Sequence, residues 1–317
     1  MPSAPRVAHR GAVDVALVAV ALAWGSSYLA TKEVVEPDGV FAFLVIRFGV
    51  ATAALAILTA PALRGITGAE LRCGALFGLI LSVVLTLETY GVTLTSASNA
   101  GLIISLTIVM TPLLERWVRG TRVPRAFHGA TVVTVVGIAC LTQTGGWAAP
   151  SPGDLLILFA AVARAVHVTV IARVSEHRAL DSARITLVQL CTALAVFAVV
   201  APMTGRPVTE VAGHMSGQAW ALTGYLALVC TVFAFLVQIR AVRCTSPARV
   251  SLLLGTEPLW AAVVGVPLAG DPVTALGVLG AVLVLAGINW GRTVDRRGQR
   301  RPAPLIAAGR RPNPRRA

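Results

Sequence analysis

Long apolar runs separated by short polar segments follow one another along the whole chain. About 20 residues of helix, at about 1.5 Å per residue, cross about 30 Å of hydrocarbon. The pattern predicts ten membrane-spanning helices, at 12–31, 39–59, 72–92, 97–115, 126–143, 154–172, 183–203, 218–239, 247–267 and 272–291. A backbone inside lipid must satisfy its own hydrogen bonds, so we expect an all-α polytopic membrane protein.

The basic residues alternate in step with these spans. If the N-terminus is cytoplasmic, 23 of the 27 Lys and Arg residues fall in cytoplasmic segments, and only Lys32 and Arg206 lie outside. Such a bias orients membrane proteins with their basic loops in the cytoplasm. The sequence therefore predicts a multi-pass protein of the cell membrane with both termini cytoplasmic. Membrane topology then explains the formal charge of +13, so we expect no nucleic-acid partner.

Composition narrows the chemistry. Only 13% of the residues are charged, against about 25% in soluble domains. The five cysteines form no C-x-x-C pair, and the five histidines show no ligand spacing, so neither a disulfide framework nor a metal site is indicated. The chain has no phosphate loop, nucleotide fingerprint or nucleophile elbow. We therefore expect no catalytic residues, no cofactor and no enzymatic activity.

The chain divides into two halves. Segment 144–153 is rich in Gly and Pro and leaves five spans on each side. Because five is odd, the second half enters the membrane in the opposite orientation, as in an inverted repeat. We predict a first five-helix repeat at 12–143 and a second at 154–291, with tails at 1–11 and 292–317.

A short motif supports the repeat, and the tail suggests a lipid contact. Thr95-Ser96-Ala97 begins the fourth span and Thr245-Ser246-Pro247 begins the ninth, each followed by a proline, Pro112 or Pro258. The spacing to the proline differs, so the repeat is diverged. The arginine-rich tail from residue 292 is expected to be disordered at the cytoplasmic lipid surface, as a topology anchor or in contact with anionic lipid.

Charged side chains inside the spans are the main functional candidates. Such a group costs about 2.5–3.5 kcal/mol at the centre of a span. Arg47 lies deep in the second span, where it could snorkel, pair with Glu88, or receive a substrate carboxylate with its planar fork. Glu88, in the third span, could pair structurally, bind a substrate cation, or take up a proton for coupling.

A second group of candidates lies in the other half. Arg164 and His167 are three residues apart and share a face of the sixth span. His167 is either a hydrogen-bonded packing residue or a group that titrates near neutral pH. Glu257 precedes Pro258 in the ninth span, and a proline there frees backbone carbonyls. Glu257 is therefore either part of a site near the midplane or the structural partner of Arg164.

Small and aromatic residues complete the set. The first span carries Trp24-Gly25-Ser26-Ser27-Tyr28, in which Gly and Ser permit close helix approach and Trp and Tyr offer amphipathic surface. We take Trp24, Ser27 and Tyr28 as cavity-lining candidates. Asn99 ends the short hinge that turns the chain and caps the fourth span, and we add it to the candidates.

Several of these pieces together resemble the EamA family of the drug/metabolite transporter superfamily. The resemblance runs over roughly 12–291 and rests on Trp24-Gly25-Ser26-Ser27, Ile46-Arg47-Phe48, 95–101 followed by Pro112, 245–261, and the glycine-rich last span. It implies two inverted five-helix repeats around a cavity walled by spans 1–4 and 6–9, with spans 5 and 10 peripheral. It also implies export of amino acids, metabolites or toxic compounds. Asp271 stands where many relatives have Glu.

The leading hypothesis is a secondary-active transporter that exports a small metabolite, amino acid or drug-like compound by alternating access. One alternative is a passive facilitator or pore in which the buried charges only hold helices together. Another is a membrane scaffold or enzyme. The expected partners are the substrate and the lipid bilayer, and the sequence leaves a homodimer open.

Overall fold

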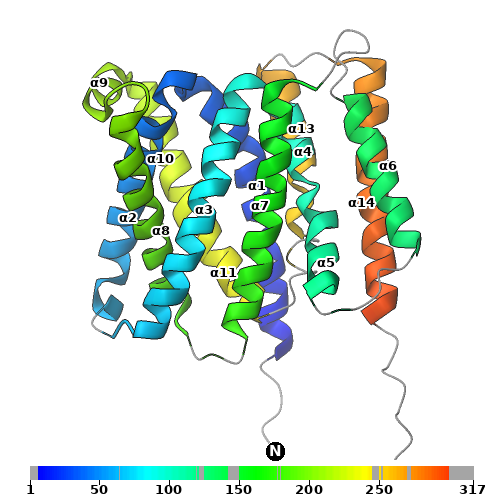
Figure 1. Cartoon of the computed structure of the whole chain (residues 1–317), viewed down its shortest axis with the longest axis horizontal. Coiled ribbons are helices and arrows are strands. Elements are labelled where there is room, and N and C mark those ends of the chain that lie inside the picture. The colour runs from blue at the N-terminus through cyan, green and yellow to red at the C-terminus, as the bar shows by residue number, and fades with distance from the viewer. Residues whose placement is uncertain are drawn as a thin grey trace, which may run out of the picture.

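The computed structural model describes residues 6–63, 65–118, 120, 125–141, 150–176, 178, 180–244, 250, 253–269 and 273–299, and these are helices joined by short connections (Figure 1). The first half holds α1 (Arg6–Val34), η1 (Pro37–Gly39), α2 (Val40–Leu63), α3 (Gly68–Leu94), α4 (Ala97–Ile104), α5 (Thr107–Val118) and α6 (Arg125–Leu141). The second half holds α7 (Pro152–Ser175), α8 (Ser182–Val200), η2 (Ala201–Met203), α9 (Val208–His214), α10 (Gly217–Ala227), η3 (Leu228–Phe233), α11 (Ala234–Cys244), α13 (Glu257–Ala269) and α14 (Ala275–Gln299).

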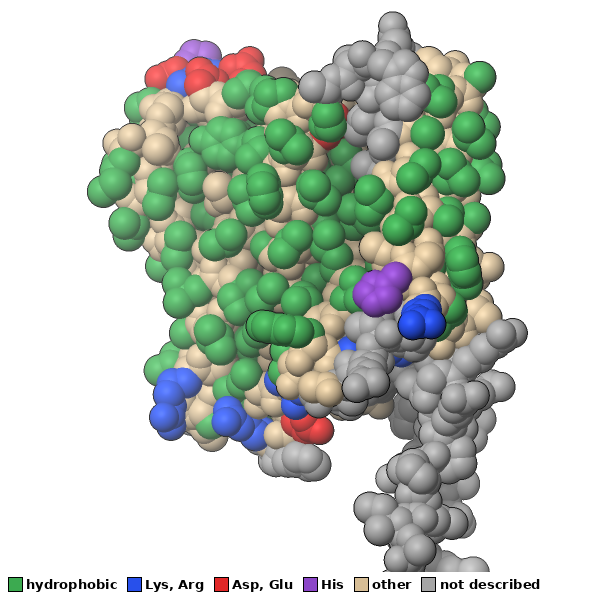
Figure 2. Space-filling view, turned by 45° about the vertical axis from the view of Figure 1, so that its right-hand side comes forward, with side chains coloured by type: hydrophobic (Ala, Val, Ile, Leu, Met, Phe, Trp, Pro, Cys, Tyr) green, Lys and Arg blue, Asp and Glu red, His purple; other side chains and the backbone are tan. Residues whose placement is uncertain are grey.

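The outer surface matches a protein embedded in lipid. Within the described residues, seven helical stretches are long and apolar enough to cross a membrane, and two shorter apolar helices lie at His128–Gly137 and Ala275–Gly291. Figure 2 shows apolar side chains covering the middle of one face, with charged side chains toward its two ends. The all-α polytopic fold is therefore confirmed. The structure does not confirm the count of ten spans, and the expected ninth span falls partly outside the described residues.

The fourth span is not the single helix that we predicted at 97–115. The helix is interrupted at Ser105 and Leu106, between α4 and α5. A second interruption lies at Gly255 and Thr256, just before α13. These two breaks are 150 residues apart, the same separation as Thr95 and Thr245. The motif that indicated a repeat thus also predicts where the second break lies relative to the first.

The eighth span contains a π-helical segment that the sequence did not predict. In η3, between α10 and α11, the Thr231 hydroxyl donates to the carbonyl of Leu226, five residues earlier, at 2.8 Å. Such segments insert one residue into a helix and are frequent at functional sites. Here the inserted turn brings Thr231 within reach of Arg47 on α2.

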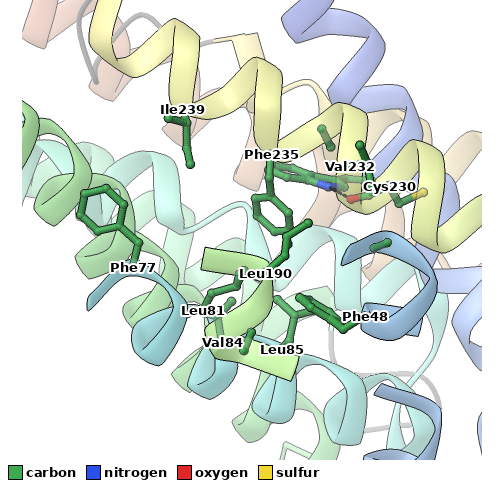
Figure 3. Close-up of a cluster of buried hydrophobic side chains, with 14 of the residues drawn as sticks. Phe48, Phe77, Leu81, Val84, Leu85, Leu190, Cys230, Val232, Phe235 and Ile239 are labelled. Carbon is green, nitrogen blue, oxygen red and sulfur yellow. Dashed lines mark hydrogen bonds between the residues drawn. The ribbon is translucent and has the colours of Figure 1, made fainter. Parts of the chain in front are cut away.

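A large apolar cluster fills the space between α2, α3, α8 and the helix made of α10, η3 and α11. Figure 3 shows Phe48, Leu190 and Phe235 within this cluster, and all three are buried. Gly74 and Gly78 allow α3 to pack closely on α8. A Cβ at Gly74 would lie 2.6 Å from Val188, so this face of α3 has no room for a larger residue. Small residues on this face of α3 thus permit close helix packing.

The last helix of each half stands at the side of the molecule. Helices α6 and α14 pack against each other at the right of Figure 1, and α5 also contacts α14. Gly137 and Gly287 permit this contact, since a Cβ at Gly137 would meet the backbone of Val284 at 2.7 Å. The peripheral position expected for spans 5 and 10 agrees with this packing.

Candidate functional site

A narrow pocket lies among α1, α4, α5, α7, α11 and the start of α13. The cavity volume is about 20 Å³, and the space reaches about 340 Å³ when the gaps between atoms and the open solvent at its mouth are included. The residues that line it are Trp24, Ile104, Ser105, Thr107, Arg164, Val168, Gln238, Leu254 and Glu257. Both helix breaks contribute to this lining, because Ser105 lies in one break and Glu257 is the first residue after the other. Discontinuous spans meeting at mid-membrane are typical of transporter binding sites.

An ion pair forms the polar centre of the pocket. Arg164 Nη1 donates to both carboxylate oxygens of Glu257, at 3.2 and 3.3 Å. The two residues are 8% and 4% exposed. A single nitrogen makes both bonds, whereas the strongest guanidinium–carboxylate pairs use two nitrogens in a fork. The structure therefore brings together Arg164 and Glu257, which the sequence left open as structural partners.

Two residues of α1 contact the two members of this pair. The Arg164 guanidinium carbon lies 4.3 Å from the centroid of the Trp24 ring, in a cation–π contact. The Tyr28 hydroxyl donates to Oε1 of Glu257. Trp24 is itself fixed because its indole N–H donates to the carbonyl of Cys230 at 2.9 Å. Both aromatic candidates from the first span thus contact the ion pair, and Trp24 also lines the pocket.

A glycine allows α1 to reach this position. A Cβ at Gly25 would lie 2.6 Å from Cβ of Trp260 and 2.8 Å from the carbonyl of Glu257. Only glycine permits this approach of α1 to α13 without displacement. The same contact brings Trp24 and Tyr28 up to the ion pair.

Glu88 and Arg47 extend the buried charges away from the pocket. Oε2 of Glu88 lies 3.9 Å from Nη2 of Arg164 and makes no hydrogen bond within the described part of the chain. Arg47 donates from Nε to the Thr231 hydroxyl at 3.0 Å and is 5% exposed. No described carboxylate lies within 4.0 Å of Arg47, so the direct pairing with Glu88 that we considered is absent. Glu88 instead approaches Arg164.

Three other candidates lie outside the pocket lining. His167 faces α8 and α3, where its Nε2 is 3.3 Å from Oε1 of Gln189 and its ring meets Phe77 edge-on. The Ser27 hydroxyl donates to the carbonyl of Trp24 at 2.7 Å. Asn99 lies in the first turn of α4, and its backbone N–H donates to Ser96 Oγ at 3.1 Å. His167 and Ser27 thus make contacts typical of packing residues, and Asn99 lies next to a helix cap.

The pocket includes polar residues that sequence reasoning missed. Gln238, on α11, is 1% exposed, and its Oε1 has no hydrogen-bond partner among the described residues. Ser105 and Thr107 lie at the break between α4 and α5. Gln238 could have been predicted from the sequence, because a polar amide within an apolar run is unusual. Nothing in the sequence near 105–107, which contains neither Gly nor Pro, marks the break.

The arrangement combines opposite charges with an aromatic face. Within the described residues, no three His, Cys, Asp or Glu side chains gather as a metal site. Among the described residues, the lining has one cation, one carboxylate, an aromatic face and several neutral polar groups. Such a site can bind and release a small polar molecule by exchange of partners at the ion pair.

Two polar clusters connect the halves of the chain at opposite ends of the molecule. The first, the Arg206 cluster, lies at the end that carries α9, at the top of Figure 1. Its guanidinium contacts Glu36 at 2.8 Å and Glu210 at 2.9 Å, and the N–H of Arg206 donates to the carbonyl of Asp38 at 2.9 Å. The hydrogen bond with Glu210 raises the pKa of Arg206. Gly205, with φ +66°, makes the tight turn that places Arg206 beside Asp38.

The second, the Glu70 cluster, joins the α2–α3 connection to the start of α8. Glu70 is 2% exposed and completes a capping box with Thr67 at the start of α3. Its Oε1 also accepts the N–H of Asp181 at 2.8 Å, and Arg184 donates to the carbonyl of Gly65 at 2.6 Å. If the two halves are superposed in order, the connections in this cluster correspond to those in the Arg206 cluster. The molecule thus has equivalent contacts at its two ends.

Comparison with known proteins identifies the family. The model of the EamA-like transporter family matches residues 12–143 and 151–290. An "Uncharacterized transporter" of Archaeoglobus fulgidus is 25% identical over 280 residues, covering 87% of this chain and 84% of the relative. A "Probable terminal-alkyne amino-acid exporter" of Streptantibioticus cattleyicolor is 27% identical over 294 residues, covering 89% and 94%. A protein of known crystal structure shares the fold, with a TM-score of 0.64 at 17% identity, covering 91% and 99% of the two chains. The two matched halves include nearly every described helix, so the chain belongs to the EamA-like transporter family of membrane transporters.

Proposed function

We propose that this transporter is a secondary-active exporter of a small amino-acid-like metabolite, working by alternating access through the pocket at Arg164 and Glu257. The observation that carries the proposal is the buried ion pair in a pocket bounded by two interrupted helices. Burying an ion pair is costly, and replacing one with apolar residues is often neutral or stabilising. A buried pair at this position is therefore better explained by ligand exchange than by stability.

The paired end clusters support alternating access. The Arg206 cluster and the Glu70 cluster each join one connection of the first half to one of the second half. Opening one end while the other stays closed requires these contacts to break in turn. The Arg206 contacts are partly exposed, whereas Glu70 is buried.

The substrate class is drawn from a relative and from the site. The probable exporter of Streptantibioticus cattleyicolor that is named for terminal-alkyne amino acids aligns over 94% of its own length. A pocket with one guanidinium and one carboxylate suits a molecule that carries both charges. We propose a compact amino acid as substrate, and propargylglycine, which has an amino group, a carboxylate and a terminal alkyne, as the first probe.

Transport in liposomes tests this function. The full-length protein is reconstituted, the vesicles are loaded with propargylglycine, and efflux is followed with and without an imposed proton gradient. We expect efflux that the gradient accelerates and that Glu257→Gln abolishes. Efflux indifferent to the gradient would favour a passive facilitator, and no efflux above empty vesicles would reject the amino-acid substrate.

The proposed location is the cell membrane with both termini in the cytoplasm. The support is the distribution of arginines, which gather on the side of the termini. A reporter fused after the tail and active only outside the cytoplasm tests this orientation. Activity of that reporter would reverse the topology and exchange the two end clusters between the faces.

A further inference from the structure

Arg47 is a buried charge to which the described part of the chain offers no close counter-ion. It lies in α2, is 5% exposed, and has no described carboxylate within 4.0 Å. Arg164 differs, because it lies 3.2 Å from Glu257 and 3.9 Å from Glu88. Removing a charge from water is costly unless an opposite charge and hydrogen bonds compensate for it. An arginine left in this state inside a membrane span therefore points to a ligand as its partner.

One edge of the Arg47 guanidinium is held, and the other edge is open. Its Nε donates to the Thr231 hydroxyl at 3.0 Å, and that hydroxyl gives its own hydrogen to the carbonyl of Leu226. Nη1 and Nη2 make no hydrogen bond with the described residues, and neither is fully enclosed, unlike Oε2 of Glu88. Because the bond at Nε orients the planar group, the two terminal nitrogens form a preoriented fork. Such a fork matches the two oxygens of a carboxylate.

The π-helical segment η3 connects this guanidinium to the pocket. The carbonyl of Cys230 accepts the indole N–H of Trp24 at 2.9 Å, and the hydroxyl of the next residue, Thr231, accepts from Arg47. Trp24 also lines the pocket and covers Arg164. The cavity of about 20 Å³ has room for about one water, so a substrate enters only if the lining moves. Because Trp24 contacts both Arg164 and η3, its displacement would open the pocket toward Arg47.

We propose that Arg47 is the carboxylate-binding end of the substrate site, with Nη1 and Nη2 each donating to one oxygen of the carboxylate. The inference rests on the proposed function and specifies which residue receives the acidic end of the amino acid. A zwitterion is neutral overall, so it adds no net charge to the two arginines and two glutamates of this region. Arg47 is then the residue that selects molecules with a carboxylate over amines of similar size.

Three related probes separate the parts of the ligand. Propargylglycine has both charged groups, pentynoic acid keeps only the carboxylate, and butynylamine keeps only the amine. Binding of each to the purified full-length protein is measured by calorimetry. We expect propargylglycine and pentynoic acid to bind, and butynylamine to bind roughly tenfold more weakly than either, or worse. Excess chloride should leave the affinity for pentynoic acid within about twofold, because a single ion does not engage both nitrogens of a planar fork as a carboxylate does.

Two variants at Arg47 test the fork. Arg47→Lys keeps the charge and loses the fork, so propargylglycine and pentynoic acid should bind roughly tenfold more weakly, or worse. Arg47→Met removes the charge, so propargylglycine should bind no more tightly than butynylamine. Butynylamine is the control within each variant, and its affinity should stay within about twofold of the parent value. Since the described residues offer Arg47 no ion pair to lose, Arg47→Met should melt no lower than the parent protein.

A variant of Thr231 tests how the fork is positioned. Thr231→Val removes the hydroxyl that accepts from Nε of Arg47, so both carboxylate probes should bind more weakly while butynylamine is unaffected. The matched control is Thr223→Val on α10. Thr223 is equally buried, and its hydroxyl donates to the carbonyl of Ala219 within the same helix. This control should leave all three affinities within about twofold.

Each other outcome rejects the inference. Butynylamine binding as tightly as propargylglycine would show that the carboxylate is not recognised, and loss of pentynoic acid binding in excess chloride would assign Arg47 to a small inorganic anion. Arg47→Met with parent affinities, whether or not it melts lower, would leave Arg47 without a ligand, and propargylglycine efflux would then stand without this inference. If the parent protein binds none of the probes, the amino-acid substrate and the carboxylate site are both rejected. The ranking of probes on the parent protein decides the question even if a variant does not fold.

Discussion

Trp24 and Tyr28 lie one helical turn apart on α1 and contact opposite members of one ion pair, Trp24 the guanidinium of Arg164 and Tyr28 the carboxylate of Glu257. The helix belongs to the first matched half of the chain and the ion pair to the second. Movement of α1 relative to α7 and α13 must therefore change the environment of the pair. In a transporter, this contact would couple occupation of the pocket to the arrangement of the two halves.

The first prediction concerns the ion pair. Glu257→Ala leaves Arg164 buried without its closest partner, which should cost about 3–5 kcal/mol of stability and abolish transport. The double variant Arg164→Met, Glu257→Met removes both charges and should recover most of that stability. Denaturant unfolding in detergent and efflux from liposomes measure the two properties.

The double variant separates the roles of the pair. A site for exchange predicts a stable protein that does not transport. Wild-type efflux from the double variant would contradict this, and it would reduce the pair to a structural contact.

The second prediction concerns Tyr28. Tyr28→Phe removes the hydroxyl that donates to Glu257 and should cost about 1.5–3 kcal/mol, the range for hydrogen bonds to charged groups. The control is Tyr90→Phe on α3, since the Tyr90 ring packs on Phe41 and its hydroxyl has no hydrogen bond in the described part of the chain. That change should alter stability by less than about 0.5 kcal/mol. Equal melting shifts in the two variants would mean that the bond to Glu257 contributes nothing.

The sequence predicted the parts of this site that carry charge. An arginine or glutamate in an apolar span is conspicuous, so Arg164, Glu257, Glu88 and Arg47 were all found. Their pairing was not predictable, because it depends on how the helices are rotated. In the structure Glu257 pairs with Arg164, and Glu88 approaches Arg164 rather than Arg47.

The neutral polar parts of the site were harder to predict. The break at Ser105 and Leu106 has no proline or glycine, and the Thr107 hydroxyl bonds across to Ala161 on α7, a contact made only in the folded bundle. The π-helical segment similarly depends on tertiary contact, since Thr231 accepts from Arg47 on α2. Local pattern cannot encode such features, because the groups that stabilise them are distant in sequence.

The third prediction concerns the two end clusters. Arg206→Gln removes partly exposed ion pairs that contribute about 0.2–1 kcal/mol each, so stability should change little. Hydrogen exchange should nevertheless accelerate at 35–39 and 204–210, since these connections lose their mutual contact. Glu70→Gln should instead accelerate exchange at 65–70 and 181–184. Each variant is the control for the other. Faster exchange at both ends in either variant would show that the two clusters do not open independently.

The fourth prediction concerns the approach of α1 to α13. Gly25→Ala places a methyl group 2.6 Å from Trp260 and 2.8 Å from the α13 backbone, so α1 must shift, at a cost of about 1–3 kcal/mol. That shift would also move Trp24 and Tyr28 away from the ion pair, so we expect efflux to fall more than stability does. Gly224→Ala on α10 is the matched control, because a Cβ there meets nothing within 4 Å. In a helix interior this control should stabilise the protein by about 0.5–1 kcal/mol and leave efflux unchanged. Full efflux in Gly25→Ala would show that the close contact of α1 with α13 is not needed to position the aromatic residues.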